Sequence, residues 1–215
     1  YIDMIYHEHT SYHHFKPLNK LFNNNNLTLN SVSNINTHGG SMRIILNNYS
    51  ENIISFYNRN ISNDFIKNDN IFDTNILTNF NILKSRITKI RSLLNKTLKD
   101  LSKKYELLYG YTAPAKTVTL LSLINADLIK KISFIIEDNI LKQDKYIPGT
   151  IIPLLSLTNA IKIIKDKKSV CIIFAWNMFD EISKKIITNS KLYPNVILSP
   201  LPETKAIEIN YEEKQ

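Results

Sequence analysis

Cysteine is almost absent from this sequence, because Cys171 is the only one among 215 residues. A single thiol excludes an internal disulfide framework and a zinc site built from cysteines. The apolar neighbours of Cys171, from Ser169 to Phe174, predict a buried strand. Since a thiol in such a strand is shielded from reagents, we expect no catalytic cysteine.

Glycine and long apolar runs are also scarce. The chain has only 4 glycines and no G-x-G-x-x-G fingerprint, so NAD binding is not implied. No run of 18 apolar residues occurs, so we expect no membrane span. Hydrophobic residues make up 43% of the chain, which suits one or two globular domains with real cores. Because the sequence starts without Met and inside a motif, we expect a fragment of a larger protein. We expect that protein to be cytoplasmic.

Acidic residues are fewer than basic ones, 19 against 27, which gives a net charge of +8. Such a balance attracts nucleic acid, anionic lipid or phosphorylated ligands. The basic residues are spread along predicted helices without aromatic interleaving, so we expect neither a nucleic-acid nor a membrane partner. A basic nucleic-acid binder remains an alternative that rests on the charge alone and predicts steep salt dependence.

Proton-transferring side chains are densest between Tyr6 and Tyr12, a stretch with two histidines, a glutamate and two tyrosines. The alternative is a polar surface loop that follows an apolar strand, Ile2 to Ile5. Two histidines four residues apart, His9 and His13, would need a helix to share a metal. Lys16-Pro17 argues against a helix there, and the zinc helix signature is missing, so we expect no metal.

Residues 1–48 are predicted to end one domain, and residues 49–104 to form a helical connector. The first part holds a helix at Pro17–Phe22 with Leu18, Leu21 and Phe22 on one face, a turn at Asn23–Asn26, and strands at Leu27–Ile35 and Met42–Leu46. The connector begins with a helix around Phe56 and Tyr57. A long amphipathic helix follows, with the apolar stripe Ile76, Phe80, Leu83, Ile87, Ile90, Leu94 and Leu101. Its stripe faces either a membrane or a core, and we favour the core because a folded domain follows.

Residues 105–205 alternate between strand and helix patterns. Strands are predicted at Tyr105–Tyr109, Ile132–Ile136, Val170–Ala175 and Val196–Leu198, and helices at Lys116–Ile124, Leu157–Ile164 and Met178–Ile187. Continuous apolar strands between helices indicate an α/β fold, a Rossmann-like parallel sheet covered on both faces. Ligands of such sheets bind at the carboxyl ends of the strands. Polar segments fall at those ends, namely Gly110–Lys116, Glu137–Gln143 and Trp176-Asn177.

Five separated motifs occur in one order, and together they resemble the sugar C-methyltransferases. They are Tyr6-His7-Glu8-His9, His38-Gly39-Gly40-Ser41, Tyr109–Lys116, Lys142-Gln143 with Tyr146–Thr150, and Ala175-Trp176-Asn177. The resemblance extends to about Pro202 and covers only the C-terminal portion of such an enzyme. It implies that residues 1–48 end a class I methyltransferase domain with its catalytic loop, and that residues 105–205 form the Rossmann-like C-terminal domain. It also implies a nucleotide-linked deoxy-keto-sugar substrate, S-adenosylmethionine bound mainly upstream of this chain, and zinc only in the missing N-terminal domain.

The resemblance also implies roles for particular residues. His9 is the base that removes the proton beside the sugar ketone, Tyr6 orients His9 or contacts the ketone, and Glu8 binds a sugar hydroxyl. A histidine suits this step because it titrates near neutral pH. The expected substrate-binding residues are Tyr12, His38, Tyr111, Ala113, Lys116, Lys142, Tyr146, Trp176 and Asn177.

Thr112 and Thr117 stand where the resembled enzymes have glycines. Glycine allows positive φ and a close approach of backbone to ligand, so this departure bears on ligand contact. It keeps open an alternative, a non-catalytic module with a Rossmann-like fold that binds a nucleotide-sugar or a protein. Trp176-Asn177 likewise has two interpretations, a wall of the ligand site or a helix cap.

Overall fold

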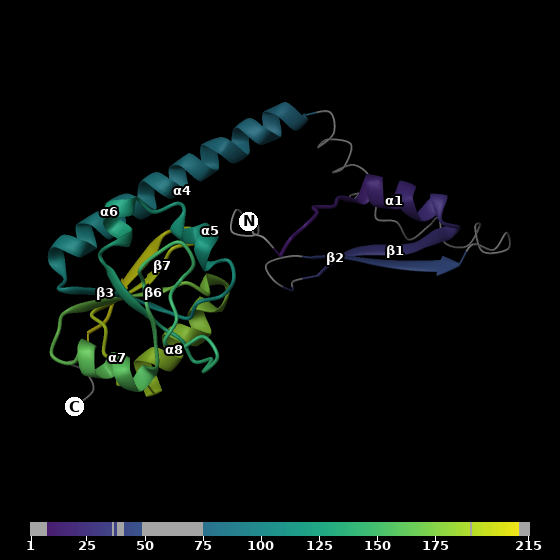
Figure 1. Cartoon of the computed structure of the whole chain (residues 1–215). Helices are drawn as coiled ribbons and strands as arrows, with labels where there is room; N and C mark the ends of the chain where they lie inside the picture. Colours follow the sequence, from purple (N-terminus) through teal and green to yellow (C-terminus); the bar gives the residue numbers. More distant parts are fainter. Residues whose placement is uncertain (1–7, 36, 38–40, 49–74, 190, 211–215) are drawn as a thin grey trace. The chain divides into compact units, whose positions relative to one another are not determined.

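The computed structural model describes residues 8–35, 37, 41–48, 75–189 and 191–210 (Figure 1). The chain divides into two compact units. One comprises Thr10–Lys84, and the other comprises Ser85–Gln215 together with Tyr1–His9. The predicted strand Ile2–Ile5 and the predicted helix around Phe56 and Tyr57 lie outside the described residues.

The Thr10–Lys84 unit contains one helix and an antiparallel strand pair, α1 (Phe15–Asn24), β1 (Leu27–Ile35) and β2 (Ser41–Asn48). The helix and both strands were predicted. Phe15 packs with Leu29 and Val32 in a small buried cluster. Leu21, which was predicted to share one face with Leu18 and Phe22, is 54% exposed. The α1 helix starts two residues before Pro17, so Phe15 provides its buried contact instead.

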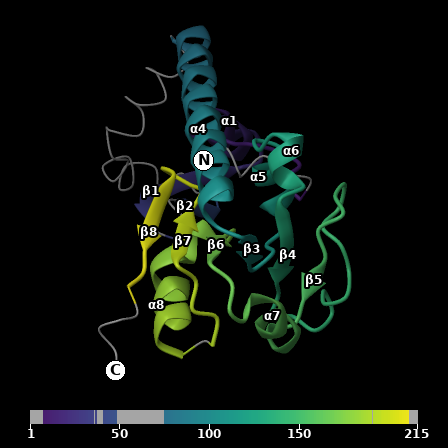
Figure 2. The same ribbon diagram turned by 90° about the vertical axis from the view of Figure 1, so that its left-hand side faces the viewer.

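The larger unit is built on a six-stranded sheet with the order β5-β4-β3-β6-β7-β8 (Figure 2). All neighbouring pairs are parallel except β7 and β8. The strands are β3 (Leu107–Tyr111), β4 (Ile132–Ile136), β5 (Leu154–Leu155), β6 (Ser169–Ile173), β7 (Val196–Ser199) and β8 (Lys205–Glu208). The predicted Rossmann-like α/β sheet is therefore confirmed.

Helices cover both faces of this sheet, as Figure 1 shows. One face carries α4 (Ile76–Lys104), α5 (Thr117–Leu121) and α6 (Ala126–Ile129), and the other carries α7 (Leu157–Ile164) and α8 (Phe179–Asn189). Successive residues of each strand point to opposite faces, so Leu108 joins the first core cluster and Leu107 the second. Burial on both faces explains why these strands read as continuous apolar runs.

The long helix α4 is confirmed, but only its C-terminal half packs on the sheet. Leu94 and Leu98 are fully buried against the first core cluster. Two residues of the predicted stripe, Phe80 and Leu83, are 60% and 39% exposed. Since Leu98 was not in the predicted stripe, the periodic pattern identified the helix correctly and its buried residues only in part.

Several element boundaries differ from the predictions. Strand β3 begins at Leu107 instead of Tyr105, because the backbone N–H of Tyr105 still donates to the carbonyl of Leu101 and continues α4. Helix α5 is shorter than predicted. Three short elements, β5, α6 and β8, were missed because two to four residues are too few to show periodicity.

Two central strands of the sheet contain a cysteine and a glycine whose burial explains the residue type. Cys171 is fully buried in β6, as predicted, and burial raises the pKa of its thiol to about 12. Gly110 in β3 leaves no room for a side chain, since a Cβ atom there would lie 2.6 Å from the ring of Phe174 and 2.7 Å from Ile135. Among the residues that the structure describes, no helix is both long and apolar enough to cross a membrane.

Candidate functional site

The carboxyl ends of β3, β4 and β6 meet at one edge of the sheet and bring three polar segments together. β3 lies between β4 and β6, so the strands that follow β3 in the chain are added first on one side of it and then on the other. Doubly wound sheets bind ligands in the crevice at such a switch point. The loops that follow these strands start at Thr112, Glu137 and Phe174. All three lie in the predicted position.

Glu137 ties two of these loops together. Its side chain is buried, and its carboxylate accepts hydrogen bonds from the backbone N–H groups of Ala113 at 3.1 Å and Asn139 at 3.0 Å. The side-chain amide of Gln143 donates to the Glu137 carbonyl at 2.8 Å. A buried carboxylate is stable only when such donors surround it, so Glu137 fixes the loop after β3 against the loop after β4.

Lys142 completes this arrangement. Its Nζ donates to the carbonyl of Ala113 at 3.0 Å and lies 3.8 Å from Glu137 Oε2. The Lys142 side chain remains 44% exposed. An ammonium group has three donors. Lys142 is therefore held by the two loops while its side chain remains partly exposed to solvent.

Lys116 and Trp176 form a second contact at the same edge. The Lys116 Nζ lies 4.6 Å from the centre of the Trp176 ring, within cation–π range. Trp176 begins the short 3-10 helix Trp176–Met178 and is buried, while Asn177 is exposed. Ala175 is the N-cap of this turn, with no side-chain capping bond. Trp176 and Asn177 therefore lie inside this turn and are not its N-cap.

A third group lies on the other face of the edge, where Tyr111, Asp138 and Lys185 interact. The Tyr111 hydroxyl donates to Asp138 Oδ2 at 3.4 Å, and Lys185 Nζ donates to the same oxygen at 3.0 Å. Burial raises the pKa of the Tyr111 phenol above its ordinary value. The hydrogen bond to Asp138 raises the pKa of Lys185. At neutral pH both groups are therefore protonated.

Thr112 adopts the left-handed backbone conformation, with φ +63°. This conformation is strained for a β-branched residue and normal for glycine. The Thr112 hydroxyl donates to the carbonyl of Tyr111 at 2.6 Å and accepts from the N–H of Ala175 at 3.2 Å. The threonine thus keeps a glycine-like backbone and fills the switch point with its own side chain.

Thr117 is the other threonine at a glycine position of the resembled enzymes. It is buried at the start of α5. Its hydroxyl oxygen makes no hydrogen bond to any residue that the structure describes. The extra side chain is therefore accommodated inside the protein, where it does not narrow the loop's outer surface.

The histidine segment precedes α1. Glu8 lies in an exposed turn, His9 is half-buried, and Tyr12 is 61% exposed. Residues 9–13 are not helical, as the sequence predicted, and the Ser11 hydroxyl is hydrogen-bonded to His13 Nε2 at 2.8 Å. The described residues include no cluster of three metal-ligating side chains. Tyr6 and His38 lie outside the described residues, so their assigned roles remain predictions.

The structure thus gathers some of the predicted substrate-binding residues and leaves others apart. Tyr111, Ala113, Lys116, Lys142 and Trp176 share the carboxyl edge, and Tyr146 is 64% exposed in a bridge with Pro153. Glu137, Asp138 and Lys185 were not among the predicted site residues. Two acidic residues directly after a buried strand were the available signal for Glu137 and Asp138. Lys185 had none, because it is one of two adjacent lysines in α8 and nothing in the sequence separates it from Lys184.

Comparison with known proteins adds one finding to this geometry. A family model for the C-methyltransferase C-terminal domain matches residues 36–193, which include the whole edge described above. No curated protein matches the chain. Because the family model covers well over half of the sequence, the chain belongs to the C-methyltransferases and carries their C-terminal domain.

Proposed function

We propose that this chain is the C-terminal part of an S-adenosylmethionine-dependent enzyme that methylates a carbon of a nucleotide-linked keto-deoxy-sugar. The observation that supports this best is the carboxyl edge of a C-methyltransferase domain, where Lys116 lies over the Trp176 ring and Lys142 is held by Ala113 and Glu137. Lysine ammonium groups are suitable partners for the phosphates of a nucleotide-linked ligand. The edge suits a nucleotide-linked ligand.

His9 is the proposed base. A carbon becomes nucleophilic when it loses the proton beside a ketone, since the resulting enolate is delocalised. Removing that proton requires a base within hydrogen-bond reach. Glu8 and Tyr6 are the proposed partners for a sugar hydroxyl and the ketone oxygen, and a donor at that oxygen stabilises the enolate.

The methyl donor needs residues that this part of the chain does not provide. S-adenosylmethionine sites in class I enzymes use a glycine-rich loop after a strand. The described glycines are Gly110, inside β3, and Gly149, in an exposed turn. These residues do not fit a methyl-donor site. The proposed roles of this chain are therefore proton removal and substrate positioning.

A second candidate function is a non-catalytic module that binds a nucleotide-sugar or a protein. The observation that favours it is a hydrogen bond at the switch point. The Thr112 hydroxyl accepts the hydrogen bond of the Ala175 N–H, which is then not available to a ligand. A ligand that relied on that N–H would be excluded.

Calorimetry separates the two candidates. The full-length enzyme is titrated with a nucleotide-linked keto-sugar and then with S-adenosylmethionine. The enzyme proposal predicts that both bind and that Lys116→Ala weakens only the sugar nucleotide, while the matched surface variant Lys130→Ala changes neither. Binding of the sugar nucleotide without S-adenosylmethionine would favour the non-catalytic module.

A further inference from the structure

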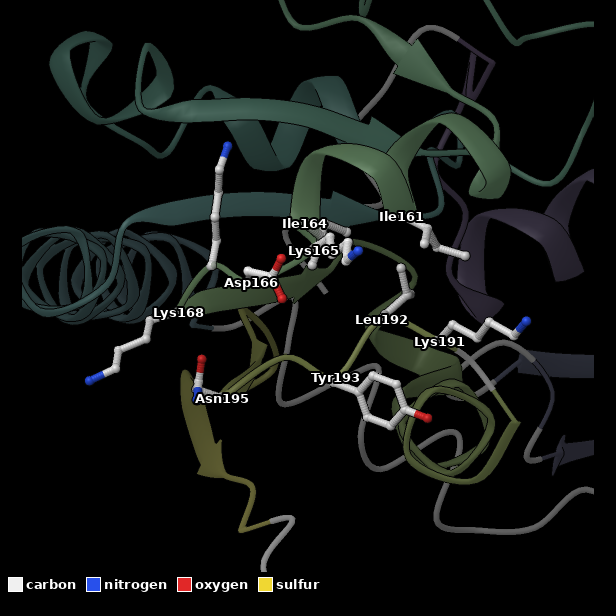
Figure 3. A pocket seen from close by; sticks show the side chains of 10 residues that line it. Ile161, Ile164, Lys165, Asp166, Lys168, Lys191, Leu192, Tyr193 and Asn195 are labelled. Carbon is white, nitrogen blue, oxygen red and sulfur yellow. The ribbon is translucent and has the colours of Figure 1, made fainter.

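A pocket of about 460 Å³ opens in the larger unit, at the sheet edge opposite the carboxyl ends. Its wall contains Lys168 and Asn195, which directly precede the parallel strands β6 and β7. Lys165, in the turn after α7, and Lys191, in the loop after α8, complete it (Figure 3). The pocket therefore lies at the amino ends of the strands.

The wall of this pocket is strongly basic. Four lysines line it, Lys165, Lys167, Lys168 and Lys191, against the single acid Asp166. Figure 3 shows the Lys168 and Lys191 side chains leaving the wall in different directions, so their ammonium groups stand at its rim. Like charges around a concave surface raise the local positive potential and attract anions.

Three aliphatic side chains form an apolar part of the pocket floor, which is held in place by the sheet. Ile164 and Leu192 are buried in the second core cluster, and Ile161 is packed against that cluster. The carbonyl of Lys168 accepts from the N–H groups of Glu106 and Leu107 at 2.9 and 3.3 Å. Asn195 Oδ1 accepts from the N–H of Ser169 at 2.8 Å. These bonds fix both sides of the wall before any ligand arrives.

We propose that this pocket binds a phosphorylated small molecule of nucleotide size. Its volume lies in the range of small-molecule sites, which run from about 300 to 1,000 Å³. The apolar floor suits a base or another flat apolar group, and the rim lysines suit its phosphates. The proposal does not depend on the methylation reaction, because the pocket and the carboxyl edge lie at opposite ends of the strands.

Calorimetry of the unaltered 215-residue chain tests this with ATP, tripolyphosphate and adenosine as probes. ATP should bind more tightly than either of the others, since only ATP has both the phosphates and the base. Binding should also weaken as salt is added. Tripolyphosphate binding as tightly as ATP, or no ATP binding at all, would overturn the proposal.

Two matched double variants locate the site. Lys165→Ala with Lys168→Ala should weaken ATP binding roughly tenfold, the loss expected for partly exposed hydrogen bonds to a charged group. Lys96→Ala with Lys130→Ala removes the same charge from helices on the other face of the sheet and should leave ATP binding unchanged. Equal weakening in both pairs would mean that net charge alone attracts the ligand, and would contradict the proposal. Melting temperatures confirm that each variant is folded.

Discussion

Thr112 shows how a single residue keeps a backbone shape that its side chain disfavours. A non-glycine residue in such a conformation carries strain on the order of 1–3 kcal/mol. The two hydrogen bonds of the Thr112 hydroxyl, to the Tyr111 carbonyl and from the Ala175 N–H, offset part of that strain. Each such bond contributes about 0.5–1.5 kcal/mol. The hydroxyl thus compensates for the Cβ atom that opposes this backbone conformation.

Substitution at Thr112 should therefore depend on whether a Cβ atom remains. Thr112→Ala loses both hydrogen bonds and keeps the Cβ atom, so we expect the free energy of unfolding to fall by about 1–2 kcal/mol. Thr112→Gly loses the same bonds but relieves the strain, and should be about 1 kcal/mol more stable than Thr112→Ala. Urea unfolding of both variants measures the difference. If Thr112→Ala is more stable than Thr112→Gly, the backbone at position 112 is not strained by a Cβ atom.

The sequence identified where Thr112 lies but not what it does. The departure from glycine was visible, and it predicted a loop less open to ligands. The hydrogen bond to Ala175 could not be predicted, because it joins residues 63 positions apart through the pairing of β3 with β6. The hydrogen bond between the Ala113 N–H and Glu137 was hidden for the same reason, since it depends on the pairing of β3 with β4.

The Tyr111–Asp138–Lys185 group makes stability depend on alkaline pH. Both the Tyr111 phenol and the Lys185 ammonium have pKa values raised in the folded state. Their contribution to the free energy of unfolding is therefore complete below the unfolded pKa values, at about pH 10. It is lost as pH rises through the folded values.

We therefore expect the free energy of unfolding to fall above about pH 10, and to fall less steeply in Asp138→Asn. That substitution removes the carboxylate whose hydrogen bond raises the Lys185 pKa. Denaturant unfolding at a series of pH values measures the slope. Asp127→Asn on the surface of α6 is the control for loss of one negative charge. Identical slopes in the two variants would contradict this assignment.

At the scale of elements, the sequence predicted long periodic segments well and short ones poorly. The strands β1 and β4 and the helix α7 have the bounds that their patterns predicted. The short strands β5 and β8 were missed, since they are extended through pairing with β4 and β7 and not through their own composition. A short sequence pattern does not show which strand will become its neighbour in the sheet.

Helix α4 has leucines whose burial differs along its length, and their substitution should change stability by different amounts. Leu94→Ala and Leu98→Ala should each lower the free energy of unfolding by about 2–5 kcal/mol, because each opens a cavity in the first core cluster. Leu77→Ala, at a position 77% exposed on the same helix, should change it by less than about 0.5 kcal/mol. Thermal or urea unfolding compares them. A similar loss at Leu77 would mean that the N-terminal half of α4 is also packed in solution.

At the scale of the whole molecule, the chain carries a C-methyltransferase C-terminal domain and, near its N-terminus, a histidine-rich segment. The domain assignment rests on the family match and the parallel sheet. The proton-transfer role of His9 rests on the motif at residues 6–9. The proposed chemistry therefore has to be tested by an activity measurement that depends on His9 itself.

The most direct test of this account is deuterium uptake from D₂O into the sugar carbon beside the ketone, followed by NMR. The full-length enzyme should exchange that proton even without methyl transfer. His9→Ala should slow exchange and kcat by about two to four orders of magnitude, with little change in binding, because the base acts in the transition state. His7→Ala should cost less. Full exchange and turnover in His9→Ala would contradict the assigned base, and no exchange in the unaltered enzyme would contradict the enolate chemistry itself.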